Sequence, residues 1–139
     1  LDKLYFLKLS ELQPNQSNKL MNWSIDKPLI LDENGSTLAA VMVKGQGLSL
    51  KKCNKNLDVQ FRKGGESIRP VGHKITKKLK KLYQEDHILP WVRDKIPLLY
   101  KKNELIGVGD LWFNQNYIAS EEEDGFLVNW TRNISIKHN

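Results

Sequence analysis

Short apolar runs separated by turn-forming residues recur along the chain, and this alternation limits the folds that it can adopt. The clearest case is KPLIL at residues 27–31 and TLAAVMV at 37–43, which flank an Asn-Gly turn. Two apolar runs joined by Asn-Gly are typical of a β-hairpin. Residues 57–62, LDVQFR, alternate apolar and polar side chains, as a half-buried strand does. We therefore expect a chain built mainly of short β-strands.

The helical signal is confined to the middle of the chain. Over residues 74–86 the apolar spacing lengthens, and four apolar side chains fall on one arc of about 100° on a helical wheel. These four are Ile75, Leu79, Leu82 and Tyr83.

A second, short helix and the remaining strands complete the predicted elements. Pro90 suits the first turn of a short helix over WVRDK. Further strands are predicted at residues 4–9, 98–100, 105–113 and 126–132. The sequence thus predicts an α+β fold, a small mixed domain of short, mostly antiparallel strands with one basic amphipathic helix and one short helix.

Length and composition favour one main domain. The chain has 139 residues, and the polar stretch after residue 9 reads as a linker, so we divide it into residues 1–22 and 23–139. No apolar run is long enough to suggest a membrane span. Cys53 is the only cysteine, so no internal disulfide is expected and the cytoplasm is the default location. The first residue, Leu1, suggests a piece of a longer protein.

Positive charge is concentrated in one segment. Residues 62–81 contain eight Lys or Arg and one acid, a net charge of +7, whereas the whole chain carries +6. If residues 74–86 are helical, Lys74, Lys77 and Lys81 form a stripe opposite the apolar arc. Such a stripe is also what a solvated helix face looks like. However, no acid lies between residues 74 and 81 to offset the repulsion, which favours a polyanionic partner such as nucleic acid.

Other residues can extend this basic surface. Arg62, Lys63 and Arg69 flank Gly64 and Gly65, whose backbone N–H groups can approach a phosphate, although the two glycines are equally well explained as a plain turn. The candidate RNA-binding residues are Arg62, Lys63, Arg69, Lys74, Lys77, Lys78, Lys81 and Arg93.

The sequence leaves the roles of two residues, Arg93 and Trp91, open. Arg93 can reach RNA, or it can pair with Asp94 or Glu85 within the fold. Trp91 can stack on a base or belong to the core, whereas the tryptophans in the apolar strands 105–113 and 126–132 are better explained as core residues.

Catalytic and metal-binding patterns are not found in the sequence. The three histidines and the cysteine lack metal-ligand spacing, and neither a G-x-S-x-G elbow nor a Walker A loop is present. We therefore predict no catalytic residue and no metal ligand in this chain.

Four motifs together resemble the C-terminal domain of bacterial tRNA(Ile)-lysidine synthetase. VQFRKGGESIRP, KKLKKLYQED, LPWVRDKIPLLY and LIGVGDLWF follow one another in that order. The resemblance covers about residues 57–130 and is most specific over 77–100. Leu89 departs from it, because a second proline is expected before Pro90.

The resemblance implies a function that charge alone does not. The family ligates lysine to C2 of cytidine 34 of tRNA(Ile) with ATP and magnesium, in an N-terminal domain that has a Ser-Gly-Gly-x-Asp-Ser loop. This loop is absent here, so the chain is expected to be non-catalytic and to hold no cofactor of its own. The implied partners are the tRNA(Ile) acceptor stem and the enzyme's own N-terminal catalytic domain, with no membrane. The implied fold is shared with part of the phenylalanyl-tRNA synthetase β chain, and residues 1–22 correspond to the end of a substrate-recognition domain and a linker.

Two other interpretations remain open at this point. The basic helix can dock on an acidic protein surface, which would make the chain a structural or interaction module. A self-sufficient enzyme is the third interpretation, and the missing loop argues against it.

Overall fold

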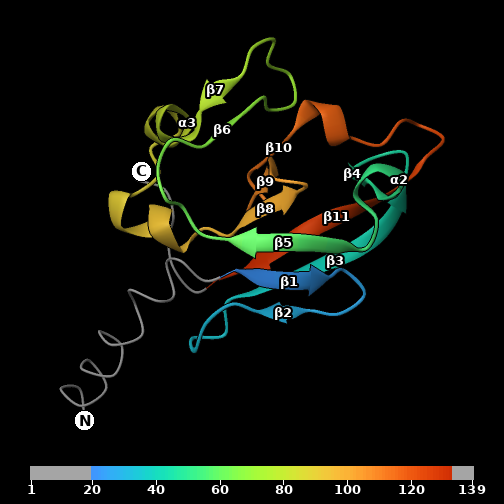
Figure 1. The fold of residues 1–139 in the computed structure, drawn as a ribbon, viewed down its shortest axis with the longest axis horizontal. Helices are drawn as coiled ribbons and strands as arrows, with labels where there is room; N and C mark the ends of the chain where they lie inside the picture. The colour runs from blue at the N-terminus through green and yellow to red at the C-terminus, as the bar shows by residue number, and fades with distance from the viewer. Residues whose placement is uncertain (1–19, 133–139) are drawn as a thin grey trace.

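The computed structural model describes residues 20–132, which form two main β-sheets with short helices at their margins (Figure 1). The larger sheet contains, in spatial order, β1 (Met21–Ser24), β5 (Asn56–Gln60), β8 (Leu98–Lys101), β9 (Glu104–Val108) and β10 (Trp112–Phe113). The second sheet contains β2 (Leu29–Ile30), β3 (Thr37–Lys44), β11 (Asp124–Thr131) and β4 (Leu48–Ser49). A separate hairpin pairs β6 (Ser67–Ile68) with β7 (Lys77–Lys78).

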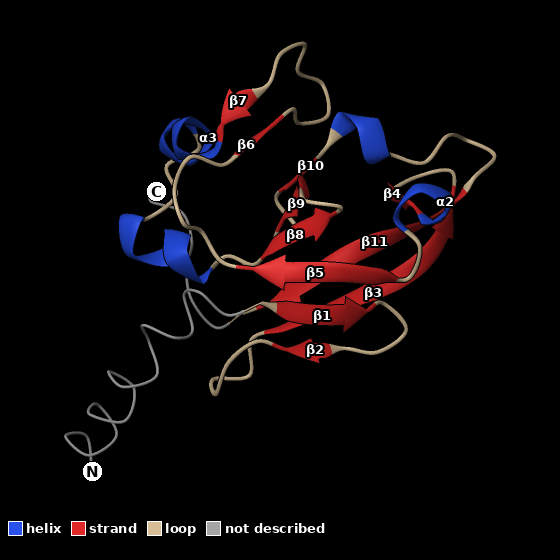
Figure 2. Ribbon diagram, viewed as in Figure 1, coloured by secondary structure: helices blue, strands red, loops and turns tan. Residues whose placement is uncertain are grey.

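Two α-helices and two 3₁₀-helices join these strands. They are α2 (Leu50–Cys53), α3 (Leu79–Glu85), η1 (Pro90–Lys95) and η2 (Gln115–Tyr117). Figure 2 shows α3 beside the β6–β7 hairpin, on one side of the two sheets. All strand pairs between residues 20 and 132 are antiparallel, so the predicted α+β class with mostly antiparallel strands is confirmed.

Two hairpins are present, one at the predicted Asn-Gly turn and the other between the predicted strands 98–100 and 105–113. β2 pairs with β3 in the register Leu29↔Leu38, and the Asp32 carboxylate in the turn accepts hydrogen bonds from the backbone of Asn34 and Ser36. β8 pairs with β9 across a turn in which Lys102 and Asn103 have φ of 51° and 68°. Positive φ at both central residues is the type I′ geometry that matches the twist of the strands.

The predicted strand at residues 57–62 is confirmed as β5, and the predicted short helix after residue 89 is confirmed as η1. In β5, Leu57 and Val59 are buried and Asp58 is only partly exposed, as the alternation predicts. Pro90 is the first residue of η1, which is a 3₁₀-helix, and Val92 is its buried residue. The strand predicted at residues 4–9 lies outside the described residues.

The long helix predicted over residues 74–86 is wrong at its start. α3 begins only at Leu79, because residues 77–78 pair with β6 and the Leu79 N–H donates to the carbonyl oxygen of Glu66 (2.9 Å). Ile75, predicted to face the core, is 66% exposed. Leu79, Leu82 and Tyr83 are buried as predicted.

One hydrophobic core draws on both sheets. It includes Trp23 of β1, Val59 of β5, Leu38 of β3 and Phe126 of β11, all buried. Burying such apolar side chains is the main favourable contribution to folding. The core therefore holds the two sheets against each other and supports the β6–β7 hairpin and α3.

Cys53 ends α2 and belongs to this core. Its side chain is 0% exposed, and burial raises the pKa of its thiol from 9.0 to about 12, although the nearby Lys101 and Lys52 act in the opposite direction. The neutral thiol is the form that the fold accommodates. Because the folded pKa is raised, its contribution to stability is complete below pH 9 and is lost as the pH rises toward 12.

We expect Cys53 to resist alkylation as long as the chain is folded. The raised pKa alone lowers the thiolate fraction about a thousandfold at pH 8, and burial blocks access as well. The measurement is the rate of iodoacetamide labelling with and without urea. Labelling of the folded chain at the rate of the unfolded chain would contradict the buried position.

Candidate nucleic-acid interface

The basic segment, residues 62–81, folds as a two-stranded ribbon that ends in the first turn of α3, and not as one helix. Its two arms pair in the registers Ser67↔Lys78 and Ile68↔Lys77, and its last three residues, 79–81, begin α3. We call residues 62–81 the basic ribbon. Because Lys74 and Lys77 precede α3, the predicted single helical stripe of Lys74, Lys77 and Lys81 is wrong, although all three belong to the ribbon.

The loop of the ribbon is fastened to the segment around β10 and η2. Pro70 forms an isolated bridge with Asn114, the Val71 N–H donates to the carbonyl of Phe113 (3.2 Å), and the Gln115 N–H donates to the carbonyl of Arg69 (2.9 Å). These backbone contacts hold the first half of the loop to the larger sheet. The second half, residues 74–76, is exposed and carries Lys74.

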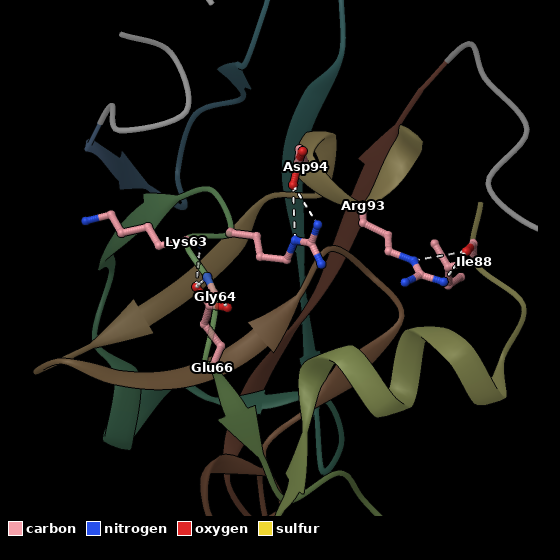
Figure 3. Close-up of polar contacts among 7 residues, drawn as sticks. Lys63, Gly64, Glu66, Ile88, Arg93 and Asp94 are labelled. Carbon is pink, nitrogen blue, oxygen red and sulfur yellow. Dashed lines mark hydrogen bonds and ion pairs between the residues drawn. The ribbon is translucent and has the colours of Figure 1, made fainter. Parts of the chain in front are cut away.

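Arg62 and Arg93, two of the predicted site residues, are engaged within the fold, and both lie near the ring of Tyr83. Arg62 forms an ion pair with Asp94 of η1 (3.0 Å), and Arg93 donates two hydrogen bonds to the carbonyl of Ile88 (3.1 and 3.0 Å) (Figure 3). Both guanidinium groups lie over the ring of Tyr83, at 6.0 and 5.8 Å from its centroid. Arg93 thus pairs with neither of the carboxylates considered from the sequence.

Lys77 and Arg69 are engaged as well. Lys77 forms an ion pair with Glu85 at the end of α3 (3.1 Å), and Arg69 donates to the side-chain oxygen of Asn116 (2.9 Å). The Nε of Arg69 is buried with no partner among the described residues. These contacts connect the ribbon to α3 and η2, so the two side chains contribute to its position as well as to its charge.

The remaining cations of the ribbon point into solvent. Their side chains are exposed, and within residues 20–132 none makes a hydrogen bond or an ion pair. They are Lys63, Lys74, Lys78, Lys80 and Lys81. Four of them are predicted site residues; Lys80 is not among the predicted residues but is equally exposed.

The turn at Gly64 and Gly65 already holds an anion of the protein itself. The backbone N–H groups of Lys63 and Gly64 donate to the carboxylate of Glu66, at 2.7 Å and at 3.1 to 3.2 Å (Figure 3). Gly64 and Gly65 have φ of 111° and 86°, which L side chains rarely adopt. The Gly64 N–H that was predicted to approach a phosphate is therefore occupied by the Glu66 carboxylate.

Tyr83 of α3 is a core residue whose ring lies near Arg62 of the ribbon and Trp112 of the larger sheet. It is 0% exposed, its ring lies 5.9 Å from that of Trp112 at 46°, and its hydroxyl has no partner among the described residues. Burial raises the pKa of Tyr83, and the charge of Arg62 lowers it by less. Burial thus favours the neutral hydroxyl, which suits a residue packed in the core.

The described residues offer neither a cluster of metal ligands nor a membrane-spanning helix. Within residues 20–132 no group of three or more His, Cys, Asp or Glu is placed to hold a metal ion. No helix in this part of the chain has both the length and the apolar character needed to cross a membrane.

Comparisons with known proteins identify the relatives of this chain. Residues 57–130 match the family described as TilS substrate C-terminal domain. The tRNA(Ile)-lysidine synthase of Coxiella burnetii is 36% identical over 126 residues, which is 91% of this chain and 28% of that protein. The same enzyme of Buchnera aphidicola subsp. Schizaphis graminum is 31% identical over 137 residues, or 94% of this chain and 29% of that protein. The chain therefore spans less than a third of the length of either relative.

A solved structure supports the fold. The structure titled "Crystal structure of TILS C-terminal domain" superposes with a TM-score of 0.63 and covers 84% of this chain and 100% of that one. Its sequence identity is 19%, so the likeness concerns the fold alone. The family match covers the ribbon, α3 and η1 completely, which places every predicted site residue inside the matched segment.

Proposed function

The chain belongs to the family of TilS substrate C-terminal domains, and from this premise we propose that it is the tRNA-binding C-terminal part of a tRNA(Ile)-lysidine synthase. In this proposal the basic ribbon grips the acceptor stem of tRNA(Ile). Catalysis, the ligation of lysine to cytidine 34 with ATP and magnesium, belongs to an N-terminal domain of the same enzyme. The chain itself contributes binding and no cofactor site, and it works in the cytoplasm.

The observation that carries the proposal is the group of five exposed lysines without protein partners in the described part of the chain. Lys63, Lys74, Lys78, Lys80 and Lys81 all belong to one ribbon. Five neighbouring like charges repel one another, and a row of phosphates offsets this repulsion while counterions are released. The phosphates of a duplex stem supply the negative charge that offsets it.

An RNA stem also suits the shape of this surface. The major groove of A-form RNA is deep and narrow, so side chains contact mainly its phosphates and its wide minor groove. Lysines serve as point charges toward phosphates without reading the sequence. We propose that Lys63, Lys74, Lys78 and Lys81 contact the backbone. Arg62, Arg69, Lys77 and Arg93 support the ribbon and add positive charge beside it.

The competing interpretation is a module that docks its lysines on an acidic protein surface. The same lysines would then face carboxylates, whose spacing differs from that of phosphates in a helix. Both interpretations use the same positive charge on the ribbon. They are therefore distinguished by the polyanion that the ribbon prefers, RNA or an acidic polypeptide.

The test is competition for a fluorescently labelled acceptor-stem hairpin bound to the 139-residue chain. We expect micromolar affinity at ~0.1 M salt, in the range of backbone-directed binding. Unlabelled hairpin should displace the label at least about tenfold more effectively than poly-L-glutamate with the same number of charges. Equal displacement, or no binding of the hairpin, would favour docking on a protein.

A further inference from the structure

An exposed tryptophan borders a hollow between α3 and η1. Trp91 is 70% exposed, the largest value among the large hydrophobic residues of the described chain, whereas Trp23 and Trp130 are 1% and 3% exposed. The hollow has a volume of about 300 Å³ and is lined by Gln84, the turn 87–89, Pro90, Trp91 and Arg93. Since Val92 is the buried residue of η1, the neighbouring indole is directed away from the core.

The walls of this hollow are held firmly. Arg93 is fixed by its two hydrogen bonds to the carbonyl of Ile88 and by its position over Tyr83. The Ile88 N–H donates in turn to the carbonyl of Tyr83 (2.9 Å). His87 turns the chain at φ of 56° and is exposed beside the hollow. A ligand would thus meet a surface that is already formed.

Unpaired cations lie within one helical turn of the hollow. Lys80 and Lys81 precede Gln84 by four and three residues in α3, so the three side chains are neighbours on the helix surface. Acids in the same region are already occupied: Glu85 pairs with Lys77, Asp94 pairs with Arg62, and Asp86 is engaged as well. Lys80 and Lys81 therefore leave unpaired positive charge beside Gln84, at the edge of the hollow.

We propose that Trp91 and this hollow take an unpaired nucleobase, stacked on the indole, while Lys80 and Lys81 hold the adjacent phosphates. An aromatic face beside unpaired cations is the combination by which proteins bind single-stranded nucleic acid. An apolar side chain of a partner protein would fill the hollow but would leave the two lysines without an anion. The nucleobase satisfies both features together.

This inference rests on the proposed function and extends it. An acceptor stem ends in an unpaired 3′ strand, so one RNA end offers both duplex phosphates and free bases. The ribbon and the hollow are joined through α3, because Lys80 and Lys81 belong to the ribbon and Gln84 lines the hollow. We infer that the ribbon holds the stem and that Trp91 holds the first unpaired base beyond it.

The experiment compares two RNA hairpins that differ only in a four-nucleotide 3′ overhang, with the 139-residue chain and its Trp91→Ala and Trp91→Phe variants. Wild type is expected to bind the overhang hairpin on the order of tenfold more tightly than the blunt one. Trp91→Ala should bind both with the blunt-hairpin affinity, and Trp91→Phe should keep most of the preference. Tryptophan fluorescence should be quenched by the overhang in wild type only.

The outcomes separate this inference from the proposed function. Equal binding of both hairpins by wild type would overturn the role of Trp91 and leave duplex binding intact. An overhang preference that survives in Trp91→Ala would overturn it too, since the base would then bind elsewhere. If neither hairpin binds, the proposed function itself is overturned. Because Trp91 is 70% exposed, its removal leaves the core in place, and a circular dichroism melt checks this.

Discussion

Replacing Lys74, Lys78 and Lys81 together by alanine is expected to lower the affinity for an acceptor-stem hairpin on the order of a hundredfold at ~0.1 M salt. All three side chains are exposed, and none has a partner within residues 20–132, so their removal breaks no contact of the described fold. If each contacts one phosphate, the slope of log K against log salt should flatten by about two to three units. Fluorescence anisotropy over a salt series measures both quantities.

The matched control removes three exposed lysines outside the ribbon. The triple variant Lys27, Lys44 and Lys51→Ala lowers the net charge from +6 to +3, as the ribbon variant does. It should change the affinity by less than about fivefold, because long-range attraction is screened over about 10 Å at this ionic strength. Equal losses in both variants would mean that RNA responds to total charge and that the ribbon is not the site.

Replacing Tyr83 by alanine is expected to destabilise the domain by about 3–5 kcal/mol, the cost of deleting a large buried aromatic side chain. The ring is 0% exposed, contacts Trp112 and supports the guanidinium groups of Arg62 and Arg93. Its loss leaves a cavity where α3 meets the larger sheet. Urea denaturation measures the change in the free energy of unfolding.

The control for this prediction is Tyr83→Phe, which keeps the ring and removes the hydroxyl. Because that hydroxyl is buried without a partner among the described residues, its removal should leave stability unchanged or raise it by about 1 kcal/mol. A loss as large as that of Tyr83→Ala would show that the hydroxyl, and not the ring, carries the contribution.

Patterns among residues adjacent in the sequence were sufficient to predict several elements of the fold. The Asn-Gly turn predicts the β2–β3 hairpin, and Lys102 and Asn103 close the β8–β9 hairpin that its flanking apolar runs predict. Alternation predicts β5, and Pro90 predicts the start of η1. In each case the deciding residues are adjacent in the sequence.

The ribbon shows where such signals fail. Ile75 continues the helical apolar spacing of Leu79 and Leu82, yet residues 77–78 pair with β6 and residues 70–71 contact β10 and Asn114. Contacts with partners far along the chain override the local preference for helix, and no local pattern indicates them. The short strands β1 and β4 and the helix α2 were likewise not predicted, since two to four residues carry too little periodicity.

The sequence predicts where the candidate site lies, but not which of its cations are free and which are paired within the fold. The excess of Lys and Arg is enough to place it at residues 62–81. Which cations are free depends on partners such as Asp94, 32 residues from Arg62, and on the Ile88 carbonyl beside Arg93. The exposure of Trp91 is also a property of the folded chain, because the sequence leaves both a core and a surface position open.

Photo-cross-linking from the ribbon to tRNA(Ile) tests the central claim most directly. A Lys78→Cys variant is labelled with benzophenone maleimide; Cys53, the only other cysteine, is buried with a pKa of about 12 and stays unlabelled. A Lys44→Cys variant serves as the control position. We predict cross-links from position 78 confined to the acceptor stem and few from position 44. Cross-links in the anticodon arm, or equal yields from both positions, would contradict acceptor-stem binding by the ribbon.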